Sequence, residues 1–276
     1  MKTALLQLNV TDDPTANLPV TVQMVRDAAA EGAEFVLTPE VSNCVSNSRA
    51  HQKEVLQHEG EDITLIALRA EAKELGIWLL IGSLGLKTDD ADGRFANRSF
   101  LIDPEGQIAA RYDKIHMFDV DIDANESYRE SSGYRPGAQA VVAQTPFAKI
   151  GMSVCYDLRF PQLYQSLSDA GAHILTVPAA FSPVTGAAHW HALLRARAIE
   201  TGCFVLAPAQ TGTHASAAHK TRDTYGHALA IDPWGEVLVD AGSEPGVYFF
   251  DLNMELCAKS RRRVPSLANR RSFSNP

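Results

Sequence analysis

Apolar positions along this chain fall into two periodic patterns. Alternation with polar residues, or a short unbroken apolar run, predicts a strand, whereas apolar residues three and four positions apart predict an amphipathic helix. Strands are predicted at residues 3–9, 35–38, 77–82, 97–102, 107–112, 149–154, 174–177, 204–207, 228–231, 237–239 and 247–251. Helices are predicted at residues 17–31, 62–75, 161–170 and 187–201. Strands and helices therefore alternate along most of the chain.

Two turn sequences join neighbouring strands as hairpins. Asp103-Pro104-Glu105-Gly106 and Asp232-Pro233-Trp234-Gly235 each place turn-forming residues between two apolar runs. Hairpins and βα units in one chain predict a two-sheet α/β sandwich with helices over both sheets. No repeat, low-complexity tract or linker interrupts the 276 residues, so a single domain over residues 1–276 is expected.

Composition and charge narrow the class of partner. Apolar residues make up 45% and charged residues 21%, which is an ordinary globular balance. The net charge of −8 argues against a nucleic-acid partner, because phosphates require a basic surface. The one basic cluster, Arg261, Arg262 and Arg263 with Arg270 and Arg271, is interpreted as a solvated helix end or a subunit contact.

The sequence predicts no membrane partner and a cytoplasmic location. Residues 1–10 are apolar but contain Gln7 and Asn9, which is typical of a first strand and not of a signal peptide. No apolar run approaches the ~20 residues needed to span a bilayer. The four cysteines are far apart and form no paired spacing, so reduced thiols are expected.

Cys155 stands where an apolar strand stops. The predicted strand at residues 149–154 ends at this cysteine, a polar turn follows, and Pro161 opens the next helix. Free backbone N–H groups at a helix N-terminus favour negative charge, so they are expected to lower the pKa of the thiol and to bind an oxyanion. By itself this pattern favours a nucleophile and a buried structural cysteine about equally.

Two more reactive side chains follow predicted strands. Glu40 comes after the strand at 35–38, and Lys114 comes after the strand at 107–112. Ligands bind outside the carboxyl ends of strands in α/β sheets, so Glu40, Lys114 and Cys155 are expected to converge. A carboxylate would then accept the thiol proton, and an ammonium would stabilise negative charge.

The sequence also contains residues that other catalytic or ligand-binding chemistries would use. A cysteine–histidine hydrolase pairing Cys155 with His116 or His227 is the strongest rival. The histidines show no zinc-site spacing, so no metal is expected. No phosphate-binding glycine motif is present.

Several motifs occur together along the chain. TPE at residues 38–40 precedes RYDKIHMFD at 111–119 and CYDLRFP at 155–161, and further motifs are GAAHW at 186–190, LRARAIE at 194–200, TYGH at 224–227 and DPWG at 232–235. Together they resemble the nitrilase, or carbon–nitrogen hydrolase, superfamily over nearly the whole chain. Within it, the sequence is most similar to the deaminated glutathione amidases, with the omega-amidases as near relatives.

The resemblance implies a four-layer α-β-β-α sandwich that needs no cofactor and forms a homodimer or a higher homo-oligomer. Residues 252–276 are expected to be a C-terminal tail that contributes to the dimer. The resemblance also implies a catalytic set with Glu40 as general base, Lys114 as oxyanion stabiliser and Cys155 as nucleophile. Glu130 matches the second glutamate of the family and is expected to orient Lys114.

Substrate contacts are implied as well. The backbone N–H of Tyr156 is expected to be the second oxyanion donor, and Arg159 matches an arginine with which relatives bind a substrate carboxylate. One position departs from the family pattern, because relatives usually have Glu where this chain has His191. That departure bears on specificity.

The predicted activity is cysteine-dependent hydrolysis of the C–N amide bond of a small, carboxylate-bearing amide. Deaminated glutathione is the first expected substrate, giving 2-oxoglutarate and cysteinylglycine. The near alternative is an omega-amidase that releases ammonia from 2-oxoglutaramate, with a nitrilase less favoured. A non-catalytic interaction protein is the alternative from a different class.

Overall fold

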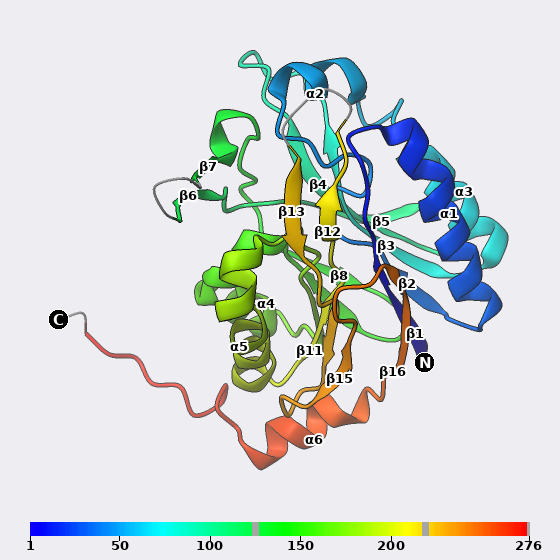
Figure 1. The fold of residues 1–276 in the computed structure, drawn as a ribbon. Coiled ribbons are helices and arrows are strands. Elements are labelled where there is room, and N and C mark those ends of the chain that lie inside the picture. The colour runs from blue at the N-terminus through cyan, green and yellow to red at the C-terminus, as the bar shows by residue number, and fades with distance from the viewer. Residues whose placement is uncertain (123–126, 217–220, 275–276) are drawn as a thin grey trace.

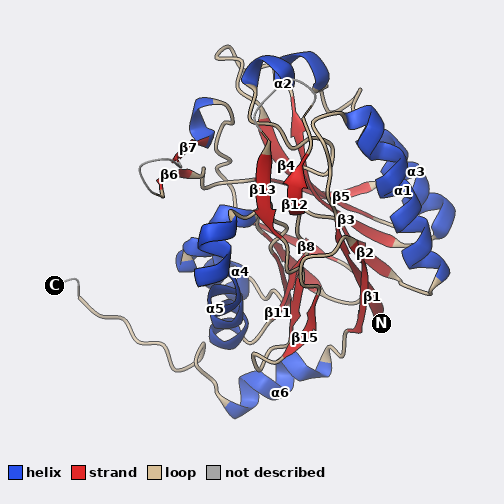
Figure 2. Cartoon of the chain, in the orientation of Figure 1, coloured by secondary structure: helices blue, strands red, loops and turns tan. Residues whose placement is uncertain are grey.

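The computed structural model describes residues 1–122, 127–216 and 221–274, and its core is formed by two six-stranded sheets (Figures 1 and 2). The first sheet has the order β16 (Gly246–Asp251), β1 (Lys2–Gln7), β2 (Phe35–Leu37), β3 (Trp78–Leu86), β4 (Ala96–Ile102) and β5 (Ile108–Asp113). The second has the order β15 (Val237–Asp240), β14 (Leu229–Ile231), β11 (Phe204–Ala207), β10 (Ile174–Thr176), β9 (Lys149–Met152) and β8 (Val141–Gln144). In each sheet three neighbouring strands are parallel and the outer pairings are antiparallel.

Helices cover the outer face of each sheet. α1 (Pro14–Ala30) and α3 (Ile63–Leu75) lie on one side of the molecule, and α4 (Pro161–Asp169) and α5 (Pro183–Thr201) lie on the other, with the sheets between them (Figure 1). The predicted four-layer α-β-β-α sandwich is therefore confirmed.

The alternation in β1 shows how the sequence builds these layers. Leu5 packs in the core that joins the two sheets, together with Phe35 and Ile150. Ala4 and Leu6 face the other way, into the core beneath α1 and α3. Full burial of a leucine side chain stabilises the fold by about 1.5–3 kcal/mol, so both faces of this interior strand must be apolar.

Some elements were not predicted because they lack a regular apolar pattern. Only Gln52 is buried in α2 (Arg49–Val55), so this helix has no apolar stripe. The other elements of this kind are the paired strands β6 (Asp119–Asp121) and β7 (Ser127–Arg129), the paired strands β12 (Thr211–His214) and β13 (Arg222–Tyr225), and helix α6 (Glu255–Arg263). Strand β8 is a further addition to the predicted strands, and residues 140–143 do form a short apolar run there. α6 lies within the predicted tail at residues 252–276, and the chain beyond it extends away from the sheets (Figure 1).

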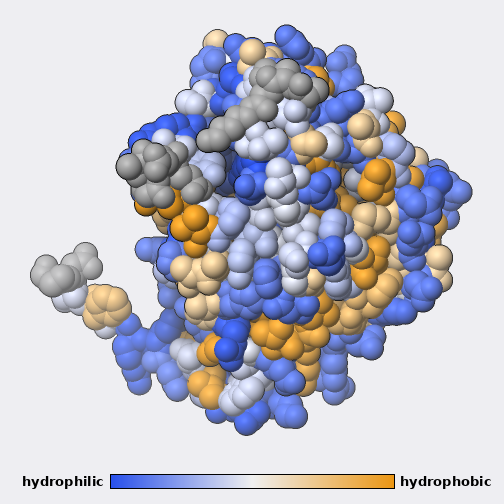
Figure 3. Space-filling model, viewed as in Figure 1, coloured by the Kyte–Doolittle hydropathy of each residue, from blue (hydrophilic) through white to orange (hydrophobic). Residues whose placement is uncertain are grey.

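The outer surface is mostly polar, as the ordinary globular composition of the sequence predicts. The face shown in Figure 3 is mostly hydrophilic, and its apolar residues form scattered groups. Within the described part of the chain, no helix combines the length and the apolar character that crossing a membrane requires.

Candidate active site

Glu40 lies just beyond β2, an interior strand of the first sheet, and only 3% of its surface is exposed. Its Oε1 accepts hydrogen bonds from Lys114 Nζ and from Asn97 Nδ2, both at 2.9 Å. Its Oε2 accepts one from the backbone N–H of Ala180 at 2.8 Å. Burial would raise the pKa of Glu40, but the Lys114 charge and the hydrogen bonds hold that pKa below its ordinary value. Glu40 is thus a buried carboxylate.

Lys114 lies directly after β5, buried between two carboxylates. Its Nζ donates to Glu40 Oε1 at 2.9 Å and to Glu130 Oε1 and Oε2 at 2.9 and 2.8 Å. Burial would lower the pKa of Lys114, but the charges of Glu130 and Glu40 raise it well above 10.5. Lys114 is therefore a cation with a fixed position.

Glu130 begins the short 3-10 helix η1 (Glu130–Ser132), immediately after β7. Its Oε2 accepts a hydrogen bond from the backbone N–H of Phe118 at 2.6 Å, in addition to the bonds from Lys114. Asn97 Nδ2 lies 3.3 Å from Glu130 Oε1 and so bridges the two glutamates. The structure thus brings together the two carboxylates that the sequence placed far apart.

Cys155 follows β9 and begins the 3-10 helix η2 (Cys155–Arg159). Its φ of 50° is uncommon for a residue other than glycine, and strained residues of this kind cluster at functional sites. The Cys155 N–H donates to the carbonyl of Pro178 at 2.9 Å, which anchors the turn beside β10. The predicted strand-to-helix turn is therefore confirmed.

The prediction of a lowered thiol pKa is wrong. Burial, the charge of Glu40 and a hydrogen bond to Glu40 raise the pKa of Cys155 well above 9.0, and the opposing charge of Lys114 does not reverse this. The main cause is burial of the thiol, and the second is the carboxylate of Glu40 beside the sulfur; the local sequence around Cys155 reveals neither. The resting thiol keeps its proton and donates it toward Glu40.

These groups line one pocket with a volume of about 780 Å³, which also includes Tyr156, Phe181 and residues from α2. The Tyr156 N–H belongs to the first turn of η2, where a helix provides no backbone acceptor. Arg159 lies outside the lining. Its guanidinium carbon is 5.9 Å from the Tyr156 ring centroid and 5.5 Å from that of Phe181, so it contacts two aromatic residues that do line the pocket.

Asn97 and Arg49 are among the residues of this pocket that sequence reasoning missed. Asn97 was placed in a predicted strand, where nothing distinguished it from other polar strand residues, and Arg49 belongs to the unpredicted α2. The Oδ1 atom of Asn97 is buried without a hydrogen-bond partner among the described residues. No local signal in the sequence marks either residue.

The whole-chain comparison supports the same assignment. The sequence matches the family model described as carbon-nitrogen hydrolase over residues 2–262. The chain belongs to the carbon–nitrogen hydrolase family. The resemblance that the motifs predicted is therefore confirmed, and the protein is an enzyme of the amidase type.

Curated relatives of this carbon–nitrogen hydrolase carry the name deaminated glutathione amidase. One from Yersinia enterocolitica is 43% identical over 236 residues, which cover 85% of this chain and 80% of the relative. One from Homo sapiens is 36% identical over 271 residues, which cover 97% of this chain and 81% of the relative.

Solved structures share the fold. The C. elegans NitFhit protein superposes with a TM-score of 0.90 at 32% identity; the match covers 98% of this chain, which spans only 65% of that longer one. Nit3 from Saccharomyces cerevisiae superposes with a TM-score of 0.84 at 27% identity over 96% of this chain and 94% of its own.

The structure does not support the cysteine–histidine rival for this carbon–nitrogen hydrolase. His116 Nδ1 lies 2.7 Å from Asp157 Oδ1, and His227 Nδ1 lies 2.8 Å from Asp240 Oδ1. His191, the position that departs from the family, contacts the same aspartate at 2.9 Å. Ligand atoms of His191, His227 and Asp240 lie within 4.8 Å of one another, but both carboxylate oxygens already contact an imidazole, and none of the three residues lines the active-site pocket.

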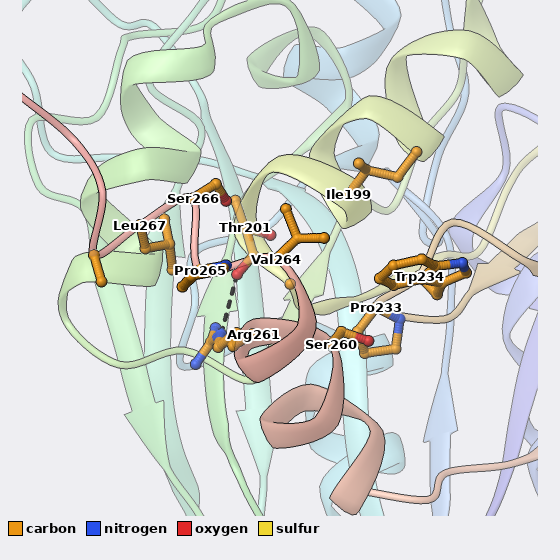
Figure 4. Close-up of a pocket in the computed structure, with 12 residues that line it drawn as sticks. Ile199, Thr201, Pro233, Trp234, Ser260, Arg261, Val264, Pro265, Ser266 and Leu267 are labelled. Atoms are coloured by element: carbon orange, nitrogen blue, oxygen red, sulfur yellow. Dashed lines mark hydrogen bonds between the residues drawn. The ribbon is translucent and has the colours of Figure 1, made fainter.

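A second hollow of the hydrolase, about 490 Å³ in volume, lies between the end of α5, the β14–β15 turn and α6 (Figure 4). Its walls include the apolar side chains of Ile199, Trp234 and Val264. The guanidinium of Arg261 is used structurally, since its Nε donates to the carbonyl of Thr201 at 3.1 Å. No group arranged for catalysis lies in this hollow among the described residues.

Proposed function

We propose that this carbon–nitrogen hydrolase is a cysteine-dependent amidase whose favoured substrate is deaminated glutathione, which it cleaves to 2-oxoglutarate and cysteinylglycine. The observation that carries the proposal is the position of Lys114, held between Glu40 and Glu130 in the pocket that contains the Cys155 thiol. The names of the relatives at 43% and 36% identity support the choice of substrate.

In the first half of the reaction, Cys155 Sγ bonds to the amide carbonyl carbon while its proton passes to Glu40. Lys114 and the Tyr156 N–H stabilise the negative charge that develops on the carbonyl oxygen. Glu40 then returns the proton to the amine, the C–N bond breaks, and a thioester remains on Cys155. Glu130 orients Lys114 throughout, because both of its oxygens accept from Nζ.

In the second half, water attacks the thioester carbonyl and gives its proton to Glu40. The tetrahedral intermediate is stabilised by the same two donors. Collapse of this intermediate breaks the C–S bond, the proton returns to the sulfur, and the carboxylic acid leaves. The resting state of a neutral thiol beside a carboxylate is thereby restored.

The pH dependence of kcat/KM tests this order of proton transfers. The pKa of Glu40 is held below 4.5, so the base form persists through neutral pH and is lost only as the pH falls below that value. The pKa of Cys155 is raised above 9.0, so the thiol keeps its proton across the same range. We therefore expect kcat/KM to be constant between pH 5 and pH 9 for a substrate that does not titrate there. A rise in kcat/KM that follows thiol ionisation within this interval would contradict transfer of the proton to Glu40 during the reaction.

The size and the borders of the pocket favour a substrate larger than 2-oxoglutaramate. A volume of about 780 Å³ lies within the range of pockets that enclose drug-sized ligands, and 2-oxoglutaramate would fill little of it. Arg159 remains our proposed ligand for the carboxylate of the oxoglutaryl group, because its guanidinium lies over Tyr156 and Phe181, two residues that line the pocket.

A side-by-side measurement of kcat/KM for deaminated glutathione, 2-oxoglutaramate and a simple nitrile tests the proposed substrate. We expect deaminated glutathione to be preferred by at least tenfold, which corresponds to about 1.4 kcal/mol of transition-state stabilisation. Preference for 2-oxoglutaramate would make the protein an omega-amidase, and turnover of the nitrile alone would overturn the amidase proposal.

The proposal includes a cytoplasmic homodimer to which residues 252–276 contribute. Exposed apolar side chains in this segment support it, since Val264 is 56% and Phe273 is 89% exposed in the single chain. Burial of large apolar side chains against a partner surface stabilises a dimer, because it removes apolar surface from water.

A further inference from the structure

Arg49 begins α2 and lines the active-site pocket. Its guanidinium carbon lies 5.1 Å from the centroid of the Phe95 ring and 5.5 Å from that of Tyr134. Gly133 provides the space, because a Cβ atom there would lie 0.8 Å from Arg49 Nη2. The Gln52 amide donates to the Tyr134 hydroxyl at 3.1 Å and so holds this ring in place. The guanidinium is therefore positioned by a slot of two aromatic rings and a glycine.

Arg49 has a guanidinium donor that no acceptor satisfies inside the described parts of the chain. Its Nη1 atom is buried and has no hydrogen-bond partner there. The carboxylate that acts on it electrostatically, Glu130, already accepts from Lys114 with both oxygens. Burial lowers the pKa of Arg49, because removal from water penalises the charged form. A buried donor without an acceptor costs free energy, which a bound anion would recover.

The other arginines of the pocket already have partners. Arg129 forms an ion pair with Asp121 at 2.6 Å. Arg222 donates to the carbonyl of Ala180 at 2.9 Å. Among the described residues that line the pocket, Arg49 is thus the arginine that retains a free buried donor.

We propose that Arg49 binds the carboxylate of the departing peptide, and that this contact selects deaminated glutathione over 2-oxoglutaramate. The inference rests on the proposed function. Deaminated glutathione carries a carboxylate on each side of the amide that is cleaved, whereas 2-oxoglutaramate carries one only on its acyl side. Arg159 and Arg49 contact different pairs of aromatic rings, so they provide two separate cationic positions for two carboxylates. The planar guanidinium suits such a group, because it donates two parallel hydrogen bonds to a carboxylate.

The test compares kcat/KM of the wild type and Arg49→Gln on three compounds: deaminated glutathione, its analogue with the glycine carboxylate converted to a carboxamide, and 2-oxoglutaramate. For Arg49→Gln we expect a loss of roughly 10- to 100-fold on deaminated glutathione and a change of no more than about twofold on the other two. The wild type should also lose roughly 10- to 100-fold when the glycine carboxylate is replaced. Equal losses on all three compounds, or no loss on deaminated glutathione, would overturn the inference.

Two variants separate binding from folding. Gly133→Ala keeps the arginine but places a methyl group where its guanidinium lies, so it should show the same substrate-dependent loss as Arg49→Gln. Arg111→Gln removes an equal charge from an exposed arginine paired with Glu59, and it should leave all three values of kcat/KM unchanged. If the wild type hydrolyses neither deaminated glutathione nor 2-oxoglutaramate, the proposed function fails; if it hydrolyses both and Arg49→Gln matches it, only the role of Arg49 fails.

Discussion

Replacing Cys155 with alanine is expected to reduce turnover of the preferred amide by about 10⁴-fold or more, because it removes the nucleophile that forms the thioester. Cys44 also lines the pocket, but its thiol donates to the backbone carbonyl of Asp12. Glu40, Lys114 and Glu130 hold one another through hydrogen bonds that do not involve the sulfur. We therefore expect the free energy of unfolding to change by no more than about 1 kcal/mol. Initial rates and urea unfolding curves of the two proteins measure both quantities.

Mass spectrometry of the acid-quenched reaction adds a direct readout for Cys155. The wild type should carry an acyl group on the peptide that contains Cys155, and the alanine variant should carry none. Cys203→Ala is the matched control, since Cys203 is buried beside Arg261, away from the active-site pocket, and should retain full activity. Normal turnover by Cys155→Ala would refute the mechanism, and a wild type that never forms the adduct and shows no amidase activity would favour a non-catalytic interaction protein.

Replacing Lys114 with methionine is expected to impair both catalysis and folding. Loss of one oxyanion donor costs about 10²–10³-fold in kcat, and here the same change also leaves Glu40 without its cation. Removing one partner of a buried ion pair typically destabilises a protein by about 3–5 kcal/mol. We expect losses of these sizes in kcat and in the free energy of unfolding from urea titrations at pH 8.

The pH dependence of the free energy of unfolding distinguishes destabilisation by the unpaired Glu40 carboxylate from a simple packing defect. In the wild type the pKa of Glu40 is lowered, so its contribution to stability is present above the ordinary carboxyl pKa and is lost as the pH falls through the lowered value. Without Lys114, burial becomes the dominant influence and raises this pKa. The contribution of Glu40 in Lys114→Met is then present below the ordinary carboxyl pKa and is lost as the pH rises.

Lys114→Met should therefore be closer to the wild type in stability at pH 5 than at pH 8. Lys73→Met removes a lysine from the exposed side of α3 and should show neither effect. A difference between Lys114→Met and the wild type that is equal at both pH values would mean that lost packing, and not the unpaired Glu40 carboxylate, destabilises the variant.

The elements with a strong apolar pattern were predictable from the sequence, and the weakly patterned ones were not. β1 and β3 consist largely of apolar residues because both of their faces are buried, and α3 buries residues three to four positions apart. α2 was missed because it buries only Gln52. α6 was missed because its sequence is mostly charged. Neither helix has an apolar face that a pattern of sequence positions could reveal.

The sequence by itself determined the layered α/β fold, the strand ends that carry Glu40, Lys114 and Cys155, and the family. It did so because burial periodicity and motif spacing are local properties of the chain. Only the tertiary structure decided that the thiol of Cys155 stays protonated and that Arg49, which lines the pocket, has a buried donor without a hydrogen-bond partner among the described residues. Both properties depend on burial and on charges contributed by segments that are far apart in the sequence. These segments come together only in the folded structure, where the two sheets pack against each other.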